Sequence, residues 1–387
     1  MKSAYLIYPI YMESDGSRRR IGGIQTYLIN LSGILMDRGY KVYIIQAATR
    51  VFEVSDGNIT VIGVPTKKIN SSGNVARELY KYISKHLSEL DLLVFCTEMA
   101  SVKCNHSKTL YIQHGVSWDM PTLRRNFILK YTIARRIWKI VQNLFYSRLY
   151  TPSNEFVCVD YNYINWLRTQ RDIDLNNVHF IPNAVMDMGF SDNSEVLMSS
   201  KSHATGEAVK ILFARRFVDY RGSRIAADAL VNLSKKFDDK ISIIISGEGP
   251  DKEYFENKLS RLSNVSFTSY HVEDTLEFHR NIDIVMVPSL GSEGTSLSLI
   301  EAMRAGCAPV VTPVGGMTSI VIDGFNGSYC SPNSYDLELK LESLILGRSK
   351  LVAIQKRAIE TVVNGPFHFQ EWTNRWINVI NKLEGGS

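Results

Sequence analysis

Two glutamates eight positions apart stand at the start of a candidate helix in the second half of the chain. Glu293 lies in a loop after an apolar run that ends at Pro288, and Glu301 lies inside the helix that the following residues predict. A rise of ~1.5 Å per residue places them roughly 12 Å apart along the helix axis. Two such carboxylates are able to accept hydrogen bonds from hydroxyl groups at both ends of one elongated ligand. In most sequences, however, such a pair is a turn residue and a solvated helix residue.

The residues between these glutamates predict a binding site for an anion. Thr295 or Ser296 is a suitable N-cap for the helix, and Gly306 is a suitable stop. The backbone N–H groups of Gly294, Thr295 and Ser296 would then lie at the positive end of the helix dipole, which suits an anionic diphosphate. Ligands of doubly wound α/β folds bind at the carboxyl ends of the strands, where this loop is expected.

A pair of arginines strengthens the prediction of an anion site. Arg216 and Arg221 follow the strand predicted at residues 209–213 and are five positions apart. Two permanent cations would neutralise a diphosphate that carries about two negative charges. They would take the place of a metal ion.

The order of the predicted elements indicates an α/β fold with two parallel sheets. Short β-branched or aromatic runs alternate with helix-length periodic segments along almost the whole chain. The polar, serine-rich residues 186–208 lack periodicity and predict a linker. We therefore expect a domain over residues 1–185, a second over 209–366, and a C-terminal helix and tail over 367–387 whose aromatic face docks on the body. The strands are expected at residues 4–8, 41–46, 60–63, 92–95, 109–113, 157–159 and 178–181 of the first half, and at 209–213, 240–246, 265–268, 284–288 and 309–312 of the second.

Composition excludes several other classes of protein. The 387 residues are 45% hydrophobic and 21% charged, which excludes a disordered chain and a coiled-coil rod. Five cysteines without a C-x-x-C spacing argue against a disulfide framework and a zinc site. The net charge of +5 is too small over this length to indicate nucleic acid. No apolar run reaches the ~18 residues that span a bilayer. We expect a cytoplasmic protein with no nucleic-acid partner.

The positive charge is concentrated in one segment. Residues 121–150 hold seven basic residues and no acidic one: Arg124, Arg125, Lys130, Arg135, Arg136, Lys139 and Arg148. Apolar residues from Phe127 to Phe145 recur at spacings of four and three, which predicts a basic amphipathic helix. One interpretation is that its apolar stripe packs on the first sheet while the charges are solvated. The other is that the segment from Arg124 to Arg148 contacts an anionic membrane.

Five phrases in the same order as in a known family complete the sequence pattern: Gly22-Gly23 before an apolar helix, Gln113-His114-Gly115-Val116, Ile181-Pro182-Asn183-Ala184, Arg216-Phe-Val-Asp-Tyr-Arg221-Gly222, and the segment from Pro288 to Pro309 with both glutamates. Together they resemble the family-4 glycosyltransferases of the two-domain GT-B fold, in which two Rossmann-like domains face each other across a cleft. The resemblance covers most of the chain. The family usually has a glycine before its first arginine, where this chain has Arg215, so the phrase leaves open which arginine faces the ligand.

The resemblance implies roles for the matched residues. Arg216 and Arg221 would hold the donor diphosphate, Glu293 the transferred sugar and Glu301 the ribose. His114 would hydrogen-bond a sugar hydroxyl, although a lone histidine is usually structural. The catalytic set is then His114, Glu293, Arg216 and Arg221, and the donor-binding set is Gly22, Gly23, Arg216, Arg221, Gly247, Gly294, Thr295, Ser296 and Glu301. Gly22 and Gly23, standing alone, would more often be a turn, and Gly247 equally suits an ordinary Gly-Pro turn.

The function that this resemblance implies is a metal-independent, retaining transfer of a sugar from a nucleotide diphosphate sugar. A UDP-sugar is the favoured donor, with GDP- and dTDP-sugars as alternatives. The acceptor would be a glycan, expected to be lipid-linked, in lipopolysaccharide or capsule synthesis. Asp172 and Asp174 resemble a metal-binding pair of another glycosyltransferase fold, but their polar surroundings argue against that role. The alternatives are a GT-B sugar-nucleotide epimerase and a non-catalytic nucleotide-binding subunit.

Overall fold

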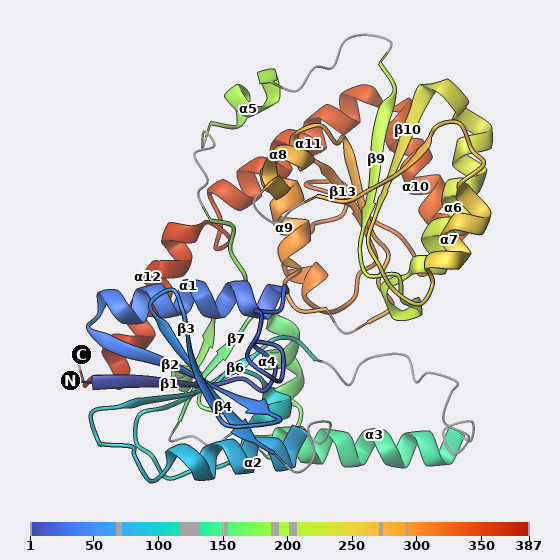
Figure 1. The fold of residues 1–387 in the computed structure, drawn as a ribbon. Coiled ribbons are helices and arrows are strands. Elements are labelled where there is room, and N and C mark those ends of the chain that lie inside the picture. The colour runs from blue at the N-terminus through green and yellow to red at the C-terminus, as the bar shows by residue number, and fades with distance from the viewer. Residues whose placement is uncertain are drawn as a thin grey trace. The chain divides into compact units, whose positions relative to one another are not determined.

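The computed structural model describes residues 2–66, 72–116, 132–148, 150, 154–186, 193–200, 207–270, 274–291 and 293–385. The chain divides into two compact units, each built around its own sheet (Figure 1). The first unit comprises Met1–His114, Phe127–Ile181 and Thr373–Ser387, and the second comprises Gly115–Asn126 and Pro182–Trp372. The last helix therefore begins in the second unit and ends in the first.

The first unit contains an eight-stranded sheet in the order β3-β4-β2-β1-β5-β6-β7-β8. All neighbours are parallel except β3 and β4. Seven of these strands are predicted from the sequence. The exception is β3, an edge strand whose residues alternate between apolar and polar and are at most partly buried. The bounds are β1 (Lys2–Ile7), β2 (Tyr40–Ala48), β3 (Phe52–Asp56), β4 (Ile59–Pro65), β5 (Leu92–Phe95), β6 (Thr109–Gln113), β7 (Glu155–Cys158) and β8 (Val178–Phe180).

The helices of the first unit include the end of the chain. They are α1 (Gly23–Asp37), α2 (Ser72–Ile83), α3 (Thr132–Ser147), α4 (Tyr161–Arg168) and the larger part of α12 (Phe369–Leu383). Trp376 of α12 is buried with its ring edge-on to Tyr27 of α1, at 6.1 Å between centroids. The expected docking of the C-terminal aromatic face is confirmed.

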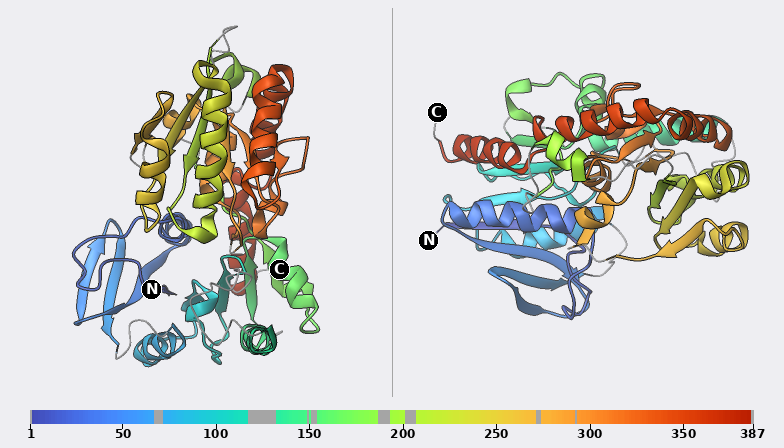
Figure 2. Two further views of the ribbon diagram at one scale, coloured as in Figure 1. Left: turned by 90° about the vertical axis from the view of Figure 1, so that its right-hand side faces the viewer. Right: turned by 90° about the horizontal axis from the view of Figure 1, so that it is seen from above.

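The second unit contains a fully parallel six-stranded sheet in the order β11-β10-β9-β12-β13-β14. Helices cover both of its faces (Figure 2). Alternate residues of one strand enter opposite cores: Ile284 and Met286 pack in one cluster, and Val285 and Val287 pack in the other. The strands are β9 (Val209–Ala214), β10 (Ile241–Ser246), β11 (Val265–Thr268), β12 (Ile284–Val287), β13 (Ala308–Val311) and β14 (Ser328–Tyr329).

The helices of the second unit follow the strands in the order expected of βαβ units. They are α5 (Ser194–Ser200), α6 (Ser223–Phe237), α7 (Lys252–Leu259), α8 (Thr275–Arg280), α9 (Leu297–Arg304), α10 (Ser334–Leu346) and α11 (Arg348–Val363). The short helix α5 lies within residues 186–208, the segment predicted as a linker. The two parallel sheets with their covering helices confirm the predicted α/β class.

Candidate active site

Glu293 lies in the loop between β12 and α9 and is buried, with 5% of its surface exposed. Ser289 of the same loop donates its hydroxyl to Glu293 Oε1 at 2.6 Å. The same oxygen forms ion pairs with the guanidinium groups of Arg215 and Arg221. The structure thus gathers one carboxylate and two permanent cations at the carboxyl ends of β9 and β12.

Arg215, and not its neighbour Arg216, belongs to this cluster. Arg215 follows β9 and also donates hydrogen bonds to the hydroxyls of Ser296 and Ser298, at 3.0 and 3.2 Å. Arg216 is exposed and has no ion pair with Glu293 among those described. Because successive side chains point in opposite directions at the end of a strand, only one of the two adjacent arginines faces the loop. The sequence pattern predicts Arg216 as a ligand of the diphosphate, whereas the geometry favours Arg215.

The carboxylate and the arginines of the cluster remain ionised despite their burial. Burial alone would raise the pKa of the Glu293 carboxyl, but Arg215 and Arg221 outweigh it and hold the pKa below its ordinary value. Burial also lowers the pKa of Arg215, an effect that Glu293 partly offsets. Arginine stays protonated even so, and Glu293 stays ionised. The cluster carries two positive charges against one negative charge, which leaves it able to attract an anion.

The loop before α9 is held from two sides. Asn183 donates its backbone N–H to the Thr295 hydroxyl at 2.8 Å, and its side-chain amide donates to the Thr295 carbonyl. Gly316 donates its backbone N–H to the carbonyl of Glu293 at 2.8 Å. A Cβ atom at Gly316 would come within 2.3 Å of the Gly294 carbonyl carbon, so only glycine permits this approach.

The start of α9 offers unused donors to a ligand. In the part of the chain that the structure describes, the backbone N–H groups of Gly294, Thr295 and Ser296 donate no hydrogen bond. Ser296 is the N-cap residue of α9, and its side chain makes no capping bond. These donors lie at the positive end of the helix dipole, next to Arg215. The backbone donors predicted for an anion site therefore lie beside a buried arginine, and the site itself stays a prediction.

Glu301 lies in α9 without a hydrogen-bond partner among the described side chains. Burial raises the pKa of its carboxyl to about 8. Burial raises the pKa of Tyr270 to about 12, and the nearby Glu301 charge contributes to this rise. A half-buried carboxyl without a partner among the described side chains is suited to accept hydrogen bonds from ligand hydroxyls.

Gly247 supports the arginine cluster from the end of β10. A Cβ atom there would come within 2.0 Å of the Arg215 carbonyl oxygen. Three residues that hold the site were not assigned a role from the sequence: Arg215, Asn183 and Ser289. Their shared signal is position, since each follows a strand or a predicted strand end. The partners of Arg215 and Asn183 are distant in sequence, so spacing alone does not reveal these two residues.

The remaining predicted residues lie in the first unit. His114 follows β6, and burial lowers its pKa to about 4, an effect that a hydrogen bond with the backbone of Cys96 only partly offsets. It is therefore neutral at pH 7. Its Nε2 atom is buried without a partner in the described chain, which leaves it available to a ligand hydroxyl. Gly22 is the N-cap of α1, and Gly23 is its first residue.

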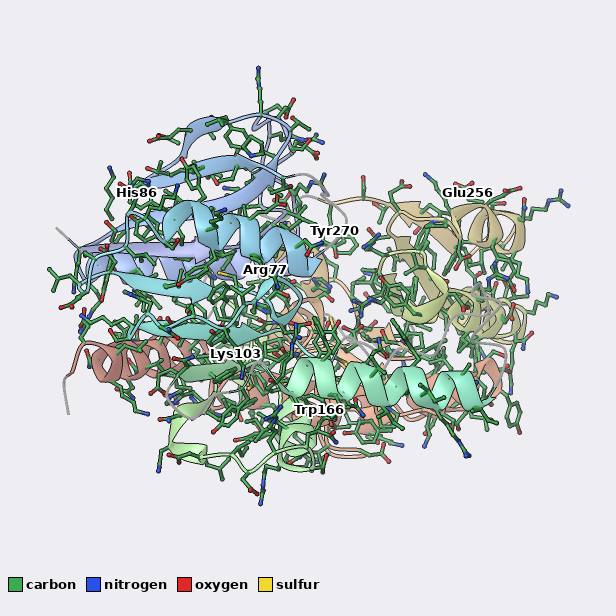
Figure 3. The ribbon with its side chains drawn as sticks, turned by 90° about the horizontal axis from the view of Figure 1, so that it is seen from below. Arg77, His86, Lys103, Trp166, Glu256 and Tyr270 are labelled. Atoms are coloured by element: carbon green, nitrogen blue, oxygen red, sulfur yellow. The ribbon has the colours of Figure 1, made fainter. Side chains whose placement is uncertain are left out.

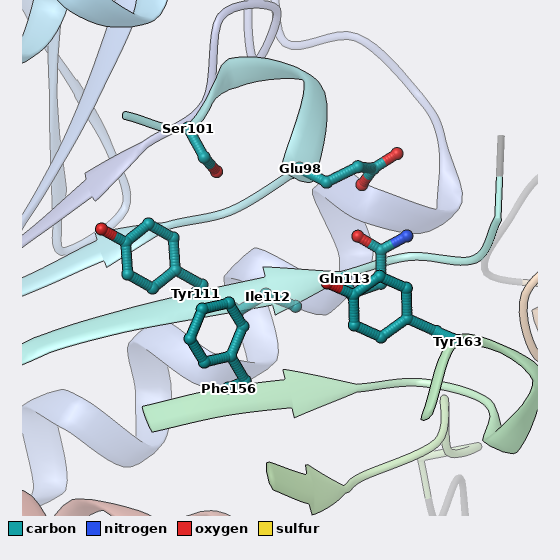
Figure 4. A pocket seen from close by; sticks show the side chains of 7 residues that line it. All are labelled: Glu98, Ser101, Tyr111, Ile112, Gln113, Phe156 and Tyr163. Atoms are coloured by element: carbon teal, nitrogen blue, oxygen red, sulfur yellow. The ribbon is translucent and has the colours of Figure 1, made fainter. Parts of the chain in front are cut away.

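The first unit also has a small pocket beside the ends of β5 and β6 (Figure 4). Glu98 and Gln113 lie at one end of its lining, and the stacked rings of Tyr111 and Phe156 lie at the other, at 4.9 Å between centroids. The pocket has room for about one water molecule, which is too small for a sugar.

The Asp172-Asp174 pair is part of the surface. Asp174 accepts a hydrogen bond from the backbone of Asn176 at 2.9 Å and caps a short 3₁₀ turn, and Asp172 is exposed. No group of three or more acidic, histidine or cysteine residues that could hold a metal ion occurs among the described residues. Asp174 thus has a local structural role as the cap of this turn.

Known proteins are similar to this chain in sequence and in fold. A family model described as glycosyl transferases group 1 matches residues 198–361. An uncharacterized glycosyltransferase of Methanocaldococcus jannaschii is 22% identical over 336 residues, which is 81% of this chain and 83% of that protein. The human phosphatidylinositol N-acetylglucosaminyltransferase has a component that is 23% identical over 94% of this chain and 73% of its own length. The phosphatidyl-myo-inositol mannosyltransferase of Mycolicibacterium smegmatis is 23% identical over 79% of this chain and 76% of its own length.

Solved structures match over nearly the full chain. Sucrose-phosphate synthase from Thermosynechococcus elongatus superposes with a TM-score of 0.74 at 14% identity, covering 100% of both chains. WaaG, a glycosyltransferase involved in lipopolysaccharide biosynthesis, gives 0.70 at 15% identity over 99% of this chain and 100% of its own. Anabaena HepE in complex with UDP-glucose superposes with a TM-score of 0.65 at 15% identity, covering 99% of this chain and 100% of its own. At these identities the matches establish the fold.

Proposed function

Since this chain is a family-4-like glycosyltransferase with a GT-B fold, we propose that it transfers a sugar from a UDP-sugar to a lipid-linked glycan, with retention and without a metal ion. The observation that carries the proposal is the cluster of Arg215, Arg221 and Glu293 beside the unused N–H groups at the start of α9. It offers two cations and three backbone donors to one diphosphate.

The donor fits the site from one end to the other. The diphosphate would bind Arg215, Arg221 and the N–H groups of Gly294 to Ser296. Glu301 would accept hydrogen bonds from the ribose hydroxyls, which supply the partners that its buried carboxyl lacks. Glu293 would bind a hydroxyl of the transferred sugar. UDP is favoured because a neighbour of the same fold has been solved with UDP-glucose.

The chemistry we propose is a front-face substitution. The acceptor hydroxyl oxygen bonds to the anomeric carbon as the bond from that carbon to the diphosphate breaks. The leaving phosphate oxygen takes the hydroxyl proton, so the products are a glycoside and a nucleoside diphosphate. Arg215, Arg221 and the helix dipole stabilise the charge that grows on the leaving group. Neutral His114 would hydrogen-bond a hydroxyl of the reacting sugar.

A lipid-linked acceptor in surface polysaccharide synthesis is supported by the relatives. Two of them are named for transfer to phosphatidylinositol or its inositol group, and WaaG is named for lipopolysaccharide biosynthesis. We propose that the first unit binds the acceptor, since the residues proposed to hold the donor diphosphate belong to the second unit. A protein that works on such an acceptor would associate with a membrane surface.

Release of nucleotide from a panel of UDP-, GDP- and dTDP-sugars without acceptor tests the proposed reaction. Slow hydrolysis of one donor class, unchanged by EDTA, is expected. Conversion of the donor to an epimer without hydrolysis would indicate an epimerase instead, and tight binding without turnover would indicate a non-catalytic nucleotide-binding protein. NMR of the product from an α-linked donor tests retention: a β-glycoside would contradict it.

A further inference from the structure

Helix α3 presents an apolar face to solvent. Seven of its large apolar side chains are between 39% and 72% exposed: Ile133, Ile137, Trp138, Ile140, Val141, Leu144 and Phe145. At 3.6 residues per turn they fall within one face roughly 160° wide. The interpretation that this stripe packs on the first sheet is therefore wrong for the described residues 132–148; Arg124, Arg125, Phe127 and Lys130 of the same segment lie outside them.

At its C-terminal end, α3 touches the first unit with its polar side. Trp166 of α4 donates its indole N–H to the Asn143 side chain at 3.3 Å, and Figure 3 shows Trp166 beside this helix. Ser147 is buried, while Asn143 and Tyr146 are half-buried. A helix that belongs to a globular core is oriented the other way, with its apolar stripe inward. This orientation leaves the apolar face largely uncovered by the described residues and available to a partner.

The charges around the apolar face indicate what that partner is. Arg135 and Arg136 flank the face on its two sides, and Lys139 lies opposite it; all three are exposed. The Arg148 guanidinium lies over the Phe145 ring at 4.0 Å. No acidic residue occurs between positions 121 and 150. An apolar band bordered by cations complements acyl chains bordered by anionic head groups.

A second copy of the chain is a poorer partner for the same face. Pairing two α3 helices would bring two all-basic segments together without any acidic residue between them. The helix has 16 residues and is too short to cross a bilayer. More generally, no helix among the described residues is long and apolar enough to span a membrane. A position within the plane of the membrane surface satisfies both faces.

We propose that α3 inserts its apolar face into the interface of an anionic membrane, parallel to the surface. Membrane insertion deepens the proposed function, because it would hold the first unit at the surface where a lipid-linked acceptor lies. Only this purpose of the insertion rests on the proposed function. Attachment then has two parts, an electrostatic attraction that salt weakens and an apolar insertion that salt does not weaken.

Flotation of the full chain with vesicles tests the insertion. We expect binding to phosphatidylcholine vesicles with about 30% phosphatidylglycerol, and part of that binding should persist in about 0.5 M NaCl. The double change Ile137→Gln and Leu144→Gln should lower the partition coefficient at least about tenfold. Leu90→Gln is the matched control, since Leu90 is as exposed as Leu144, at 61%, but lies outside α3. It should leave binding unchanged.

Two controls, one spectroscopic and one that removes charge, distinguish insertion into the membrane from purely electrostatic attachment to its surface. Trp138 fluorescence should shift to shorter wavelength on vesicles and be quenched by brominated acyl chains, and Trp138→Tyr should remove that change. Replacing Arg135, Arg136 and Lys139 by glutamine should remove the preference for anionic lipid. Binding that salt abolishes entirely and that the glutamine pair in the apolar face does not alter would overturn the proposal. So would an oligomer that this apolar pair dissociates while vesicle binding stays unchanged.

Failure of the proposal and failure of the proposed function give different results. The α3 variants should hydrolyse a UDP-sugar at the wild-type rate in lipid-free solution, because they leave the second unit unchanged. If the wild type binds vesicles but hydrolyses no donor, only the proposed transferase reaction is contradicted.

Discussion

Arg215 and Glu293 form a buried ion pair, with 9% and 6% of their side chains exposed. They are 78 positions apart in sequence and belong to the loops that follow β9 and β12. In the absence of a ligand, the carboxylate therefore occupies part of the anion site that the arginines form. A bound diphosphate would share these cations with Glu293, which would bring this carboxylate, proposed to bind the sugar, next to the leaving group.

The first prediction concerns the two adjacent arginines. Arg215→Gln should lower the free energy of unfolding by ~3 kcal/mol, because removing one partner of a buried pair leaves an uncompensated charge and Arg221 compensates only in part. It should also weaken UDP binding at least about tenfold. Arg216→Gln is the matched control and should change the stability by less than about 0.5 kcal/mol. Urea denaturation and calorimetric titration measure both; equal losses in the two variants would show that Arg216 is also part of the site.

The second prediction concerns the ionisation of Glu301. Its pKa of about 8 in the free protein means that it is mostly protonated at pH 7. Ribose hydroxyls that donate to the carboxylate should lower this pKa, so UDP binding should release close to one proton at pH 7 and affinity should rise roughly tenfold between about pH 7 and 9. Titration calorimetry in buffers of different ionisation enthalpy counts the proton.

Glu301→Gln is the control for that experiment, because UDP has a phosphate that also titrates. The variant should bind more weakly, by about tenfold, and lose the proton release that the wild type shows. A wild type and a variant with the same proton count would contradict a ribose-binding carboxylate.

The third prediction concerns the close contact of two loops. Gly316→Ala should displace the Glu293 loop, because its Cβ atom would overlap the Gly294 backbone. We expect a loss of ~1–3 kcal/mol in unfolding free energy and weaker UDP binding. Gly33→Ala is the control: it lies within α1, where a Cβ atom meets nothing within 4 Å. That change should stabilise the protein by up to ~1 kcal/mol. Similar behaviour of the two variants would show that the contact does not position the site.

Sequence periodicity predicts the central strands of both sheets well. Apolar runs such as Ile284 to Val287 are buried on both faces, and this pattern is strong enough to be read without a structure. The edge strand β3 carries Glu53, Ser55 and Asp56 and lacks that pattern. The two-residue strand β14 is too short for any periodic signal.

The candidate site was predictable where neighbours in sequence form it. The loop from Glu293 to Ser296 and the helix that carries Glu301 follow from local signals. The choice between Arg215 and Arg216 does not, since it depends on which side chain the end of β9 directs toward Ser296 and Glu293. The outward orientation of the apolar face of α3 could not be predicted either, because periodicity reveals an apolar face but not what that face contacts.

The last prediction concerns the attachment of the C-terminal helix to the first unit. Glu384 accepts hydrogen bonds from Arg38 and Tyr40 at 2.7 and 2.8 Å and pairs with Lys2. Burial alone would raise the pKa of Glu384, but these donors lower it to about 2. A carboxyl whose pKa is lower in the folded state stabilises the fold above its unfolded pKa, near 4.5, and loses that effect as the pH falls toward 2.

Glu384→Gln should therefore lower the free energy of unfolding at pH 7 by about 1–2 kcal/mol, a value reduced for partial solvent exposure. The difference from the wild type should shrink steadily as the pH falls below about 4.5. Glu248→Gln is the control, since Glu248 pairs with Lys252 but is 78% exposed, and its effect should stay within about 0.5 kcal/mol at every pH. Urea denaturation at a series of pH values measures both variants. A Glu384 effect that is constant with pH would show that packing of the side chain, rather than its charge, holds the helix in place.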